Sequence, residues 1–391
     1  MAWSELAGYV TVVSFIFISI FYLSYLAILH CSLRRSGRPA SSETVTDQGL
    51  PAVSMIVPTY NEEKIISKKI SNTMQLNYPK DKLEVIFVDG CSTDGTVDAI
   101  VKCAGLTNIK LVVEDCRMGY NAAVLAGVSK TNVSSDGIVV ATGADVCYDL
   151  NALRRLCRHF VDFRVGAVAG REILANRNES VGTKIEGMYR KLQDFLSEAE
   201  MTIDSPFDVK GEICAVRMGI AKSLLERRKE LLRKGSFDCC ISSETRKRGY
   251  KVVYDRESTY TEYAPVRLSD RMRMQTRRAK TLLESLLMYK DMILNRTYGA
   301  YGTLILPAHF IMLIVIPWLF LAGLASLTAM LYFDPNILLV LGASFSLLAL
   351  RRIRLFTISF VQSQLSLVWA MLMIAMGRKT QIFNQIQSTR R

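Results

Sequence analysis

The sequence has little histidine, and its cysteines lack the spacing of a metal site or a disulfide framework. Only three of the 391 residues are histidine, and only His159 lies between the long apolar runs near the two ends. The nine cysteines show no paired pattern, as expected for reduced thiols in the cytosol. The sequence therefore indicates neither a zinc site nor a serine–histidine pair, and a carboxylate is the simplest candidate for a general base.

Charged residues are missing from four stretches. Residues 6–33, 297–333 and 355–377 contain no Asp, Glu, Lys or Arg, and neither does a shorter run at 335–350. About 20 apolar residues cross a bilayer as a helix, so the first and third runs are each long enough for one span. The second run contains two prolines and predicts either one span with an interfacial approach or a hairpin. The fourth predicts a short tilted span or a re-entrant piece.

The first apolar run is interpreted as a membrane anchor, not as a secretory signal. Residues 1–33 lack a basic start, a short apolar stretch and a small-residue cleavage site. The basic flank at Arg34, Arg35 and Arg38 follows the run, which by the positive-inside rule predicts an external N-terminus and places residue 34 onward in the cytosol. Residues 34–50, rich in Ser, Thr, Gly and Pro, are expected to be a linker. The expected location is the cell membrane, as a multi-pass protein.

The net charge of +13 is explained by proximity to a membrane. Basic residues concentrate at 267–280, 351–354 and 378–391, each beside an apolar run. This placement predicts a lipid bilayer as a partner and no nucleic acid. Residues 266–296 alternate basic and apolar side chains at near-helical spacing, which predicts an amphipathic interfacial helix, or an ordinary surface helix of the soluble domain. About three C-terminal transmembrane helices are expected over 297–377, followed by a basic tail.

The central part of the chain predicts alternating strands and helices. Short β-branched runs, each ending at turn residues, are separated by stretches with helical patterns. This order is typical of βαβ units and predicts an α/β domain with a parallel sheet, whose ligands bind at the carboxyl ends of the strands. The expected strands are 53–57, 83–88, 109–113 and 137–142, and the expected helices are 63–76 and 119–128.

Four carboxylate-bearing segments follow one another along this central part. They are Pro-Thr-Tyr-Asn-Glu-Glu at 58–63, Val-Asp-Gly-Cys-Ser-Thr-Asp-Gly-Thr at 88–96, Thr-Gly-Ala-Asp at 142–145 and Ser-Phe-Asp-Cys-Cys at 236–240, followed by Gln-Thr-Arg-Arg at 275–278. In this order and spacing they resemble the family 2 glycosyltransferases, which move a sugar from a nucleotide donor with inversion. The flanking apolar runs make the chain similar to the membrane-embedded synthases of cellulose, hyaluronan and poly-N-acetylglucosamine. The resemblance implies a GT-A glycosyltransferase domain over 51–265.

The resemblance also implies a nucleotide-sugar site after the first strands. Asp89 closes the second expected strand, where the family recognises the nucleotide base; its alternative role is that of a turn or helix-cap aspartate. The segment Arg117-Met-Gly119-Tyr120 is similar to a phosphate-facing Arg-x-Gly-Lys, with Tyr120 in place of the lysine. The nucleoside pocket would include Thr59, Tyr60, Asn61 and Glu62, which without the resemblance would read as a plain helix start.

The third segment stands where the family has its metal motif. Gly143 replaces the first acid of the usual Asp-Ala-Asp, so Asp145 is the one expected metal carboxylate. Mg²⁺ commonly takes one or two protein carboxylates together with substrate phosphates and water, so a single Asp beside a diphosphate is compatible with Mg²⁺ or Mn²⁺. The expected role is to neutralise charge on the leaving nucleoside diphosphate. Restoring an acid at 143 is expected to tighten the metal dependence or leave it unchanged.

The fourth segment matches the position of the catalytic base in the family. Asp238 is the remaining acid of a pair whose partner is here Phe237. A carboxylate can take the proton from an acceptor hydroxyl as it attacks the anomeric carbon. The alternative for Asp238 is a helix N-cap. Gly211 and Glu212 lie where the family has an acceptor-side loop.

Residues 275–279 resemble the Gln-x-x-Arg-Trp signature of processive synthases. Arg278 matches the arginine that can hold a diphosphate, Gln275 matches the glutamine, and Ala279 replaces the tryptophan that helps place the acceptor. The chain is therefore expected to transfer a sugar from a UDP-sugar, or a GDP-sugar, to a growing polysaccharide. A polyprenyl-phosphate lipid acceptor is the first alternative. A non-catalytic membrane scaffold with a degenerate domain is the second, suggested by Gly143, Phe237 and Tyr120.

Overall fold

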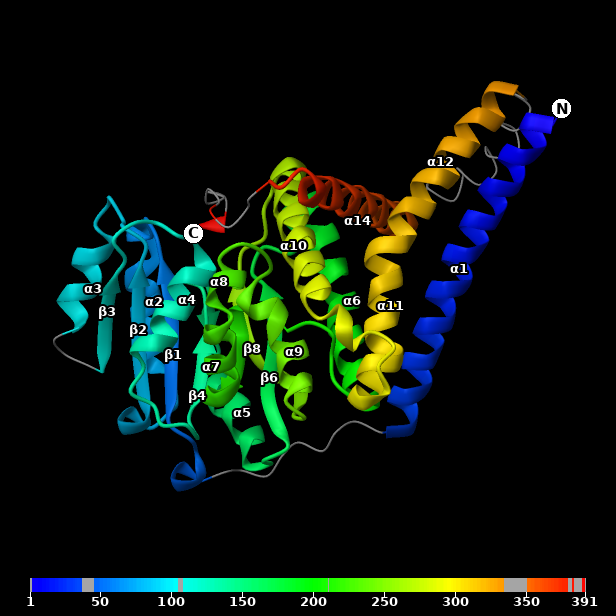
Figure 1. Ribbon diagram of the computed structural model, residues 1–391. Helices are drawn as coiled ribbons and strands as arrows, with labels where there is room; N and C mark the ends of the chain where they lie inside the picture. Colours follow the sequence, from blue (N-terminus) through cyan, green and yellow to red (C-terminus); the bar gives the residue numbers. More distant parts are fainter. Residues whose placement is uncertain are drawn as a thin grey trace.

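A computed structural model describes residues 2–36, 46–104, 108–209, 211–333, 350–378, 382 and 389–390. A twisted sheet with helices on both faces forms one part of the molecule, and a group of long helices forms the other (Figure 1). Helices α6 (Val181–Ile203) and α10 (Leu268–Met288) lie between the two parts (Figure 1).

The sheet has eight strands and is mixed. Four strands, β1 to β4, run parallel, as the sequence predicts. The next strand, β7, is antiparallel to β4, so the prediction of a parallel sheet is wrong beyond the four strands that the pattern revealed. The order is β3 (Ile109–Val113), β2 (Leu83–Asp89), β1 (Val53–Thr59), β4 (Ile138–Ala141), β7 (Cys214–Arg217), β6 (Val165–Leu174), β8 (Lys251–Glu262) and β5 (Cys147–Tyr148).

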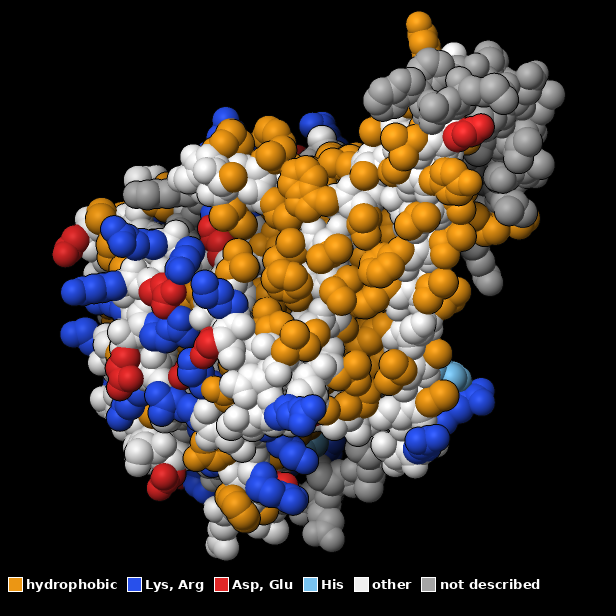
Figure 2. All heavy atoms as spheres, turned by 45° about the vertical axis from the view of Figure 1, so that its right-hand side comes forward, with side chains coloured by type: hydrophobic (Ala, Val, Ile, Leu, Met, Phe, Trp, Pro, Cys, Tyr) orange, Lys and Arg blue, Asp and Glu red, His pale blue; other side chains and the backbone are white. Residues whose placement is uncertain are grey.

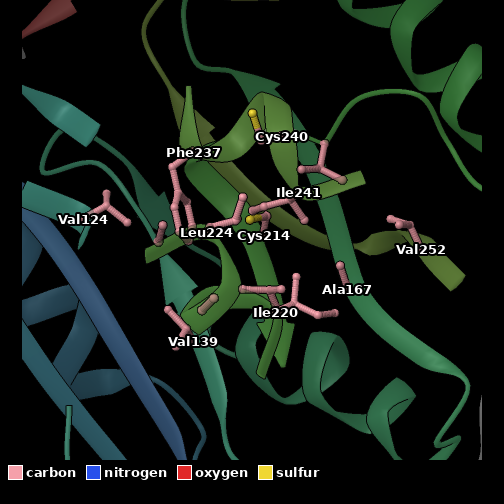
Figure 3. Close-up of a cluster of buried hydrophobic side chains, with 14 of the residues drawn as sticks. Val124, Val139, Ala167, Cys214, Ile220, Leu224, Phe237, Cys240, Ile241 and Val252 are labelled. Carbon is pink, nitrogen blue, oxygen red and sulfur yellow. The ribbon is translucent and has the colours of Figure 1, made fainter. Parts of the chain in front are cut away.

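Both faces of the sheet are covered, which explains why its central strands are apolar throughout. Along β1, Met55 and Val57 pack into one core and Ile56 into the other, because successive side chains of a strand point to opposite faces. Figure 3 shows the core on the second face, with Val124 and Phe237 among its side chains. The helices on the sheet are α2 (Glu63–Gln75), α3 (Thr96–Ala104), α4 (Tyr120–Lys130), α5 (Ala152–Arg158), α7 (Met218–Glu226), α8 (Arg228–Leu231) and α9 (Phe237–Lys247).

Three helices of the described residues are long and apolar enough to cross a membrane: Glu5–Ser36 within α1, Tyr301–Tyr332, and Ile353–Ala375 within α14. The second is one continuous helix in which the π-helical turns η7 (Tyr301–Ile305) and η8 (Ile311–Val315) alternate with α11 (Leu306–Phe310) and α12 (Ile316–Phe333). Of the two structures predicted for residues 297–333, the single long helix is therefore correct and the hairpin is wrong. Residues 335–349 of the fourth apolar run lie outside the described residues.

The long helices pack closely on one another. α1 (Ala2–Ser36) runs antiparallel to α11 and α12, and α14 (Arg351–Ala375) lies across this pair on the side of α10 (Figure 1). Phe15, Phe320 and Phe360 meet edge to face where α1, α12 and α14 come together, with ring centroids 5.6–6.2 Å apart. Apolar side chains cover the outer surface of this group (Figure 2), as expected for helices in contact with lipid.

One buried glutamate joins the sheet domain to the long helices. Glu200, near the end of α6, accepts hydrogen bonds from the Tyr25 hydroxyl of α1 at 2.8 Å and from the backbone N–H of Phe207 at 2.8 Å. Its carboxylate also lies 2.7 Å from Nε2 of His309 on α11. Three segments far apart in the sequence therefore meet at one side chain, which fixes the domain against the apolar helices.

A second buried glutamate, Glu186, lies at the centre of an ion network between α6 and α10. It contacts Arg190 at 3.0 Å, Arg271 at 3.0 Å and Arg278 at 3.2 Å. Its side chain is 1% exposed and that of Arg271 is fully buried. Burial alone would raise the pKa of Glu186, but the three guanidiniums together hold it below its usual value. The helix expected over 266–296 is thus tied to the domain by buried ions on one side.

Substitution Glu186→Gln is expected to lower the thermal unfolding temperature in detergent at pH 7, because it leaves buried arginines without their partner. The free energy of unfolding is expected to fall by about 3–5 kcal/mol, as is typical when one partner of a buried ion pair is removed. Because the folded pKa is depressed, this stabilisation is present above the unfolded pKa of about 4.3 and is lost as pH falls below it. The control Glu198→Gln, on the same helix with half-exposed Arg256 as its partner at 3.6 Å, should cost under about 1 kcal/mol. Equal losses in the two variants would contradict the account.

Candidate active site

The carboxyl ends of β1 and β2 lie side by side, with Thr59 opposite Asp89 in the register. The Asp89 carboxylate accepts hydrogen bonds from the Thr59 hydroxyl at 3.2 Å, from the Ser92 backbone at 2.8 Å and from the Ser92 hydroxyl at 2.5 Å. Asp89 is fully buried. It therefore holds the loop after β2, the turn role left open by the sequence, and its contact with a nucleotide base stays a prediction.

The loops after β1 and β2 are bound to each other. Asn61 adopts a φ of 53°, a left-handed conformation that Asn tolerates better than most side chains. Its backbone N–H donates to the Ser92 hydroxyl and its side-chain oxygen accepts from Thr93, both at 2.8 Å. The backbone N–H of Glu62 donates to the Thr96 hydroxyl at 2.8 Å. These bonds fix the start of α2 and thereby the position of the Glu62 side chain.

The side chains of Tyr60 and Arg117 are in contact beside these loops. The Arg117 guanidinium lies 3.7 Å from the centroid of the Tyr60 ring, within the range of a cation–π contact. Gly119, two residues further on, has a φ of 93°, which a side chain would strain, and it directly precedes α4. The structure thus brings together the residues expected to bind the nucleoside from the ends of β1 and β3.

A buried lysine of α2 hydrogen-bonds to the loop that carries Asp145. Lys69 of α2 is 2% exposed and donates to the Thr142 hydroxyl at 3.0 Å and to the Val146 carbonyl at 3.1 Å. Burial lowers the pKa of Lys69 to about 8, against the opposite effect of Glu212 and other anions. A small cavity of about 110 Å³, lined in part by Lys69 and Cys147, opens beside Asp145. Lys69 had not been expected to support the site; a lysine on the apolar face of a helix was the available signal.

Asp238 lies in the first turn of α9, against the backbone of Gly211. A Cβ atom added to Gly211 would lie 2.2 Å from Oδ2 of Asp238, so only glycine leaves room for this carboxylate. The Ser236 hydroxyl donates to the other carboxylate oxygen. Because the N-cap position of α9 is Ser236 and not Asp238, the N-cap alternative for Asp238 is wrong. Phe237, the position of the missing partner acid, is fully buried in the core shown in Figure 3.

Asn121, a residue that the sequence analysis did not single out, positions the start of α9. Its side-chain oxygen accepts from the Phe237 backbone at 2.9 Å, and its amide nitrogen donates to the carbonyls of Leu231 at 2.7 Å and Gly235 at 3.1 Å. Asn121 is 3% exposed. A polar residue at a buried position of an otherwise apolar helix was the available signal.

Four acidic side chains gather around this site: Glu62, Asp145, Glu212 and Asp238, here called the carboxylate cluster. Burial, then the negative charges of Asp145 and Asp238, raise the pKa of Glu212 to about 7. Burial and Asp145 also raise the pKa of Glu62 to about 7, against the lowering effect of Arg390. Like charges in a partly dry site repel one another, so the cluster favours the binding of positive charge.

Two neighbouring arginines of α10 lie near the acidic groups of the site. Arg278 pairs with Glu186 and, at 3.8 Å, with Glu262. Arg277 is near Glu212 and other members of the carboxylate cluster, which act against the lowering of its pKa to about 10 by burial and by Arg278. Arg277 is therefore a candidate for binding a diphosphate that the resemblance, matched residue by residue to Arg278, did not identify.

Gln275 and Ala279, the other two α10 residues predicted from the sequence to belong to the site, contact other parts of the structure. Gln275 is 7% exposed and accepts a hydrogen bond from Arg271 at 3.0 Å, within the network around Glu186. Ala279 packs against Leu283, Leu367 and Ala370, where α10 meets α14. A tryptophan at 279 would therefore meet α14, and the expectation that this position faces the acceptor is not supported by its packing.

The C-terminal tail contributes a cation to the site. Arg390 lies 2.8 Å from Glu62 through Nη2 and also contacts the Asp145 carboxylate through Nη1. Its side chain is 15% exposed. From the sequence, residues 378–391 are expected only to form a basic tail, because no local pattern predicts a contact with residues this distant in the chain.

The residues present suit a divalent cation only if the substrate supplies further ligands. Among the described residues no group of three His, Cys, Asp or Glu side chains could hold a metal ion. Asp145 nevertheless attracts a cationic group, Arg390, and Oε2 of Glu212 beside it is buried with no hydrogen-bond partner in the part of the chain that the structure describes. One or two carboxylates with diphosphate oxygens and water make a usual Mg²⁺ environment.

Comparison with known sequences gives a match to one family over part of the chain. Residues 54–225 match the family described as Glycosyl transferase family 2. Glycosyltransferase AglE of Haloferax volcanii is 36% identical over 84 residues, 21% of this chain and 28% of that protein. Beta-monoglucosyldiacylglycerol synthase of Nostoc sp. is 28% identical over 168 residues, 42% of this chain and 36% of that protein. The chain thus spans about a third of the length of these curated relatives.

Comparison with solved structures concerns the fold. Mannosyltransferase PcManGT from Pyrobaculum calidifontis, solved in complex with GDP-Man and Mn²⁺, superimposes with a TM-score of 0.75 over 95% of this chain and 100% of that chain, at 23% identity. The predicted GT-A-type fold with apolar helices is thereby confirmed.

Substitution Arg390→Ala is expected to tighten Mn²⁺ binding in the presence of a nucleoside diphosphate, because the tail guanidinium and the metal compete for Asp145. Calorimetry on the purified full-length protein should show a several-fold lower Kd, while the exposed Arg378→Ala, with the same loss of charge, should leave it unchanged. Tighter binding in both variants would indicate a general charge effect and contradict the competition.

Proposed function

We propose that this chain, whose residues 54–225 form a glycosyl transferase family 2 domain, is a membrane-bound enzyme that transfers a sugar from a nucleotide donor with inversion. The observation that carries the proposal is the convergence of Asp145, Glu212 and Asp238 beside the carboxyl ends of β1, β2 and β4. Ligands of open α/β sheets bind at this edge. The apolar helices α1, α11–α12 and α14 supply the membrane attachment, and the basic flank of α1 supports a cytosolic domain.

The donor would lie across the ends of the parallel strands. Tyr60 and Arg117 offer a ring and a guanidinium on which a base can stack. Arg277 and Arg278 would hold the diphosphate, because guanidinium groups match the geometry of phosphate oxygens. We propose a UDP- or GDP-sugar, the second supported by the GDP-Man in the structure of the mannosyltransferase. A panel of radiolabelled donors would identify the base and the sugar.

A divalent cation, Mg²⁺ or Mn²⁺, would be held at Asp145. When bound, it would neutralise charge that develops on the leaving diphosphate. The protein itself contributes the carboxylates that attract the cation, the buried Lys69 that fixes their loop, and the arginines of α10 on the other side of the diphosphate.

Asp238 would act as the general base. The bond from the anomeric carbon to the diphosphate breaks as the acceptor oxygen attacks from the opposite side, and its proton passes to the Asp238 carboxylate. The hydrogen bond from Ser236, the close backbone of Gly211 and the contacts of Asn121 keep this carboxylate in place. A base is needed if the acceptor is a hydroxyl group.

We further propose that the acceptor is carried by a membrane lipid. The facing surfaces of α1, α12 and α14 are filled by aromatic side chains where they meet, and so do not form a polar passage at this junction. Ala279, which stands where the processive synthases have a tryptophan that helps place the acceptor, packs on α14. One of the relatives, beta-monoglucosyldiacylglycerol synthase, is named for a lipid product. A growing polysaccharide is the second candidate, favoured by the α10 arginines beside the site.

Substitution Asp238→Asn should leave donor binding nearly intact and lower turnover by a factor of about 10² to 10⁴, the usual contribution of a general base. Release of nucleoside diphosphate measures turnover, and calorimetry measures donor binding. Asp98→Asn, which removes an exposed acid from the first turn of α3, is the matched control. Near-normal turnover of Asp238→Asn would remove this residue from the mechanism and favour an ionised lipid phosphate, which needs no base.

A product analysis separates the acceptors. Full-length protein in nanodiscs of extracted membrane lipid, given the radiolabelled donor that it uses, is expected to place the label in organic-extractable glycolipid. Label in high-molecular-weight, water-soluble material would overturn the lipid acceptor and support the polymer. Absence of any nucleoside diphosphate release across the donor panel would contradict the enzyme itself and support the scaffold.

A further inference from the structure

The space beside Gly143 is filled by carboxylates from other positions. A Cβ atom on Gly143 would lie 2.4 Å from Oε2 of Glu212 and 2.8 Å from Oδ1 of Asp145. Two carboxylate oxygens therefore border the position that a side chain at 143 would occupy. The absence of a side chain at 143 is what allows Glu212 to reach this place.

The strand register explains why Glu212 faces Gly143. Strands β4 and β7 are antiparallel neighbours, paired from Ile138 with Arg217 to Ala141 with Cys214. Continued by two residues, the same register places 143 opposite 212, in the short helical turn η4 (Gly211–Ile213) that leads into β7. Residues directly opposite each other across antiparallel strands have side chains within contact distance. A small residue on one side thus gives room to a long acid on the other.

One oxygen of the Glu212 carboxylate has no hydrogen-bond partner among the described residues. The backbone carbonyl of Glu212 accepts a hydrogen bond from the Tyr148 hydroxyl at 2.8 Å, which fixes the main chain. The oxygen without a partner, Oε2, is buried. Asp145 and Asp238 act on the carboxylate with charge of the same sign, and the opposite charges of Arg278 and Lys69 have a smaller effect. A buried acceptor atom without a partner is costly, and a cation bound between Glu212 and Asp145 would satisfy it.

We propose that Glu212 supplies the second carboxylate of the divalent-cation site, in the place of the acid that Gly143 lacks. This inference rests on the proposed function, since it concerns the cation that accompanies the nucleoside diphosphate. Asp145 and Glu212 then contribute one protein oxygen ligand each, and diphosphate oxygens and water complete the shell. Glu212 is thereby reassigned from the acceptor side to the donor side of the site.

The same geometry changes the outcome expected for an acid at 143. In the single variant Gly143→Asp, the new side chain would enter the space of the Glu212 carboxylate and displace it. It would not simply add a ligand, so tighter metal dependence is no longer expected. Removal of Glu212 at the same time would free this space. The double variant Gly143→Asp/Glu212→Ala would then carry the second acid of the site at position 143 in place of position 212.

Mn²⁺ binding to the full-length protein with saturating GDP or UDP tests the proposal. Electron paramagnetic resonance of free Mn²⁺ should show about 10- to 100-fold weaker binding by Glu212→Gln, which keeps the side-chain shape and loses the charge. The double variant should regain most of the lost affinity. The exposed Glu226→Gln on α7 is the control for loss of one negative charge, and thermal unfolding in detergent confirms that each variant is folded.

Each result decides the proposal. Weak binding by Glu212→Gln that is restored in the double variant supports it. Binding by Glu212→Gln equal to that of the wild type overturns it, and so does weak binding that the double variant leaves unrestored. The variant Asp145→Ala distinguishes failure of this inference from failure of the proposed function. If Asp145→Ala also binds Mn²⁺ like the wild type, the cation site of the proposed function is wrong. If only Asp145→Ala loses affinity, the role of Glu212 alone is overturned.

Discussion

The repulsion among Glu62, Asp145, Glu212 and Asp238 is the constraint on which this site depends. Side chains of like charge come together in a partly buried place only where the backbone fixes them. Burial, reinforced by the neighbouring carboxylates, raises the pKa values of Glu62 and Glu212 to about 7. Such an arrangement is unfavourable for folding alone. It becomes favourable when a cation enters, whether a metal with its diphosphate or the guanidinium of Arg390.

The surrounding structure is arranged to hold these carboxylates in place. Hydrogen bonds from Lys69 fix the loop that carries Asp145, and hydrogen bonds of Asn121 fix the turn that precedes Asp238. On the far side, the buried network around Glu186 fixes α10 and hence its arginines against α6. Glu200, on the same α6, binds side chains of α1 and α11. One helix therefore links the site to the apolar helices, which are long enough to cross a membrane.

Much of this arrangement was predictable from the sequence, because local patterns determine it. The β-branched runs gave strands β1 to β4, and the rule that ligands bind at strand ends predicted the edge at which Asp145 lies. Contacts between distant segments were not predictable. No local signal showed that β7 would run antiparallel to β4, which brings Glu212 opposite Gly143. Nor did one show that Asp89 would be buried by its own loop, or that Arg277 would face the carboxylate cluster.

The central claim is that the carboxylate cluster exists to bind a divalent cation together with a nucleoside diphosphate. A structure of the full-length protein with Mn²⁺ and GDP or UDP, recorded at a wavelength that reveals manganese by its anomalous scattering, tests this directly. The account predicts one manganese peak between Asp145 and Glu212, with diphosphate oxygens as further ligands and Arg390 displaced from the site. A nucleoside diphosphate bound at the strand ends with no manganese beside Asp145, or with Arg390 still in contact with it, would contradict the account.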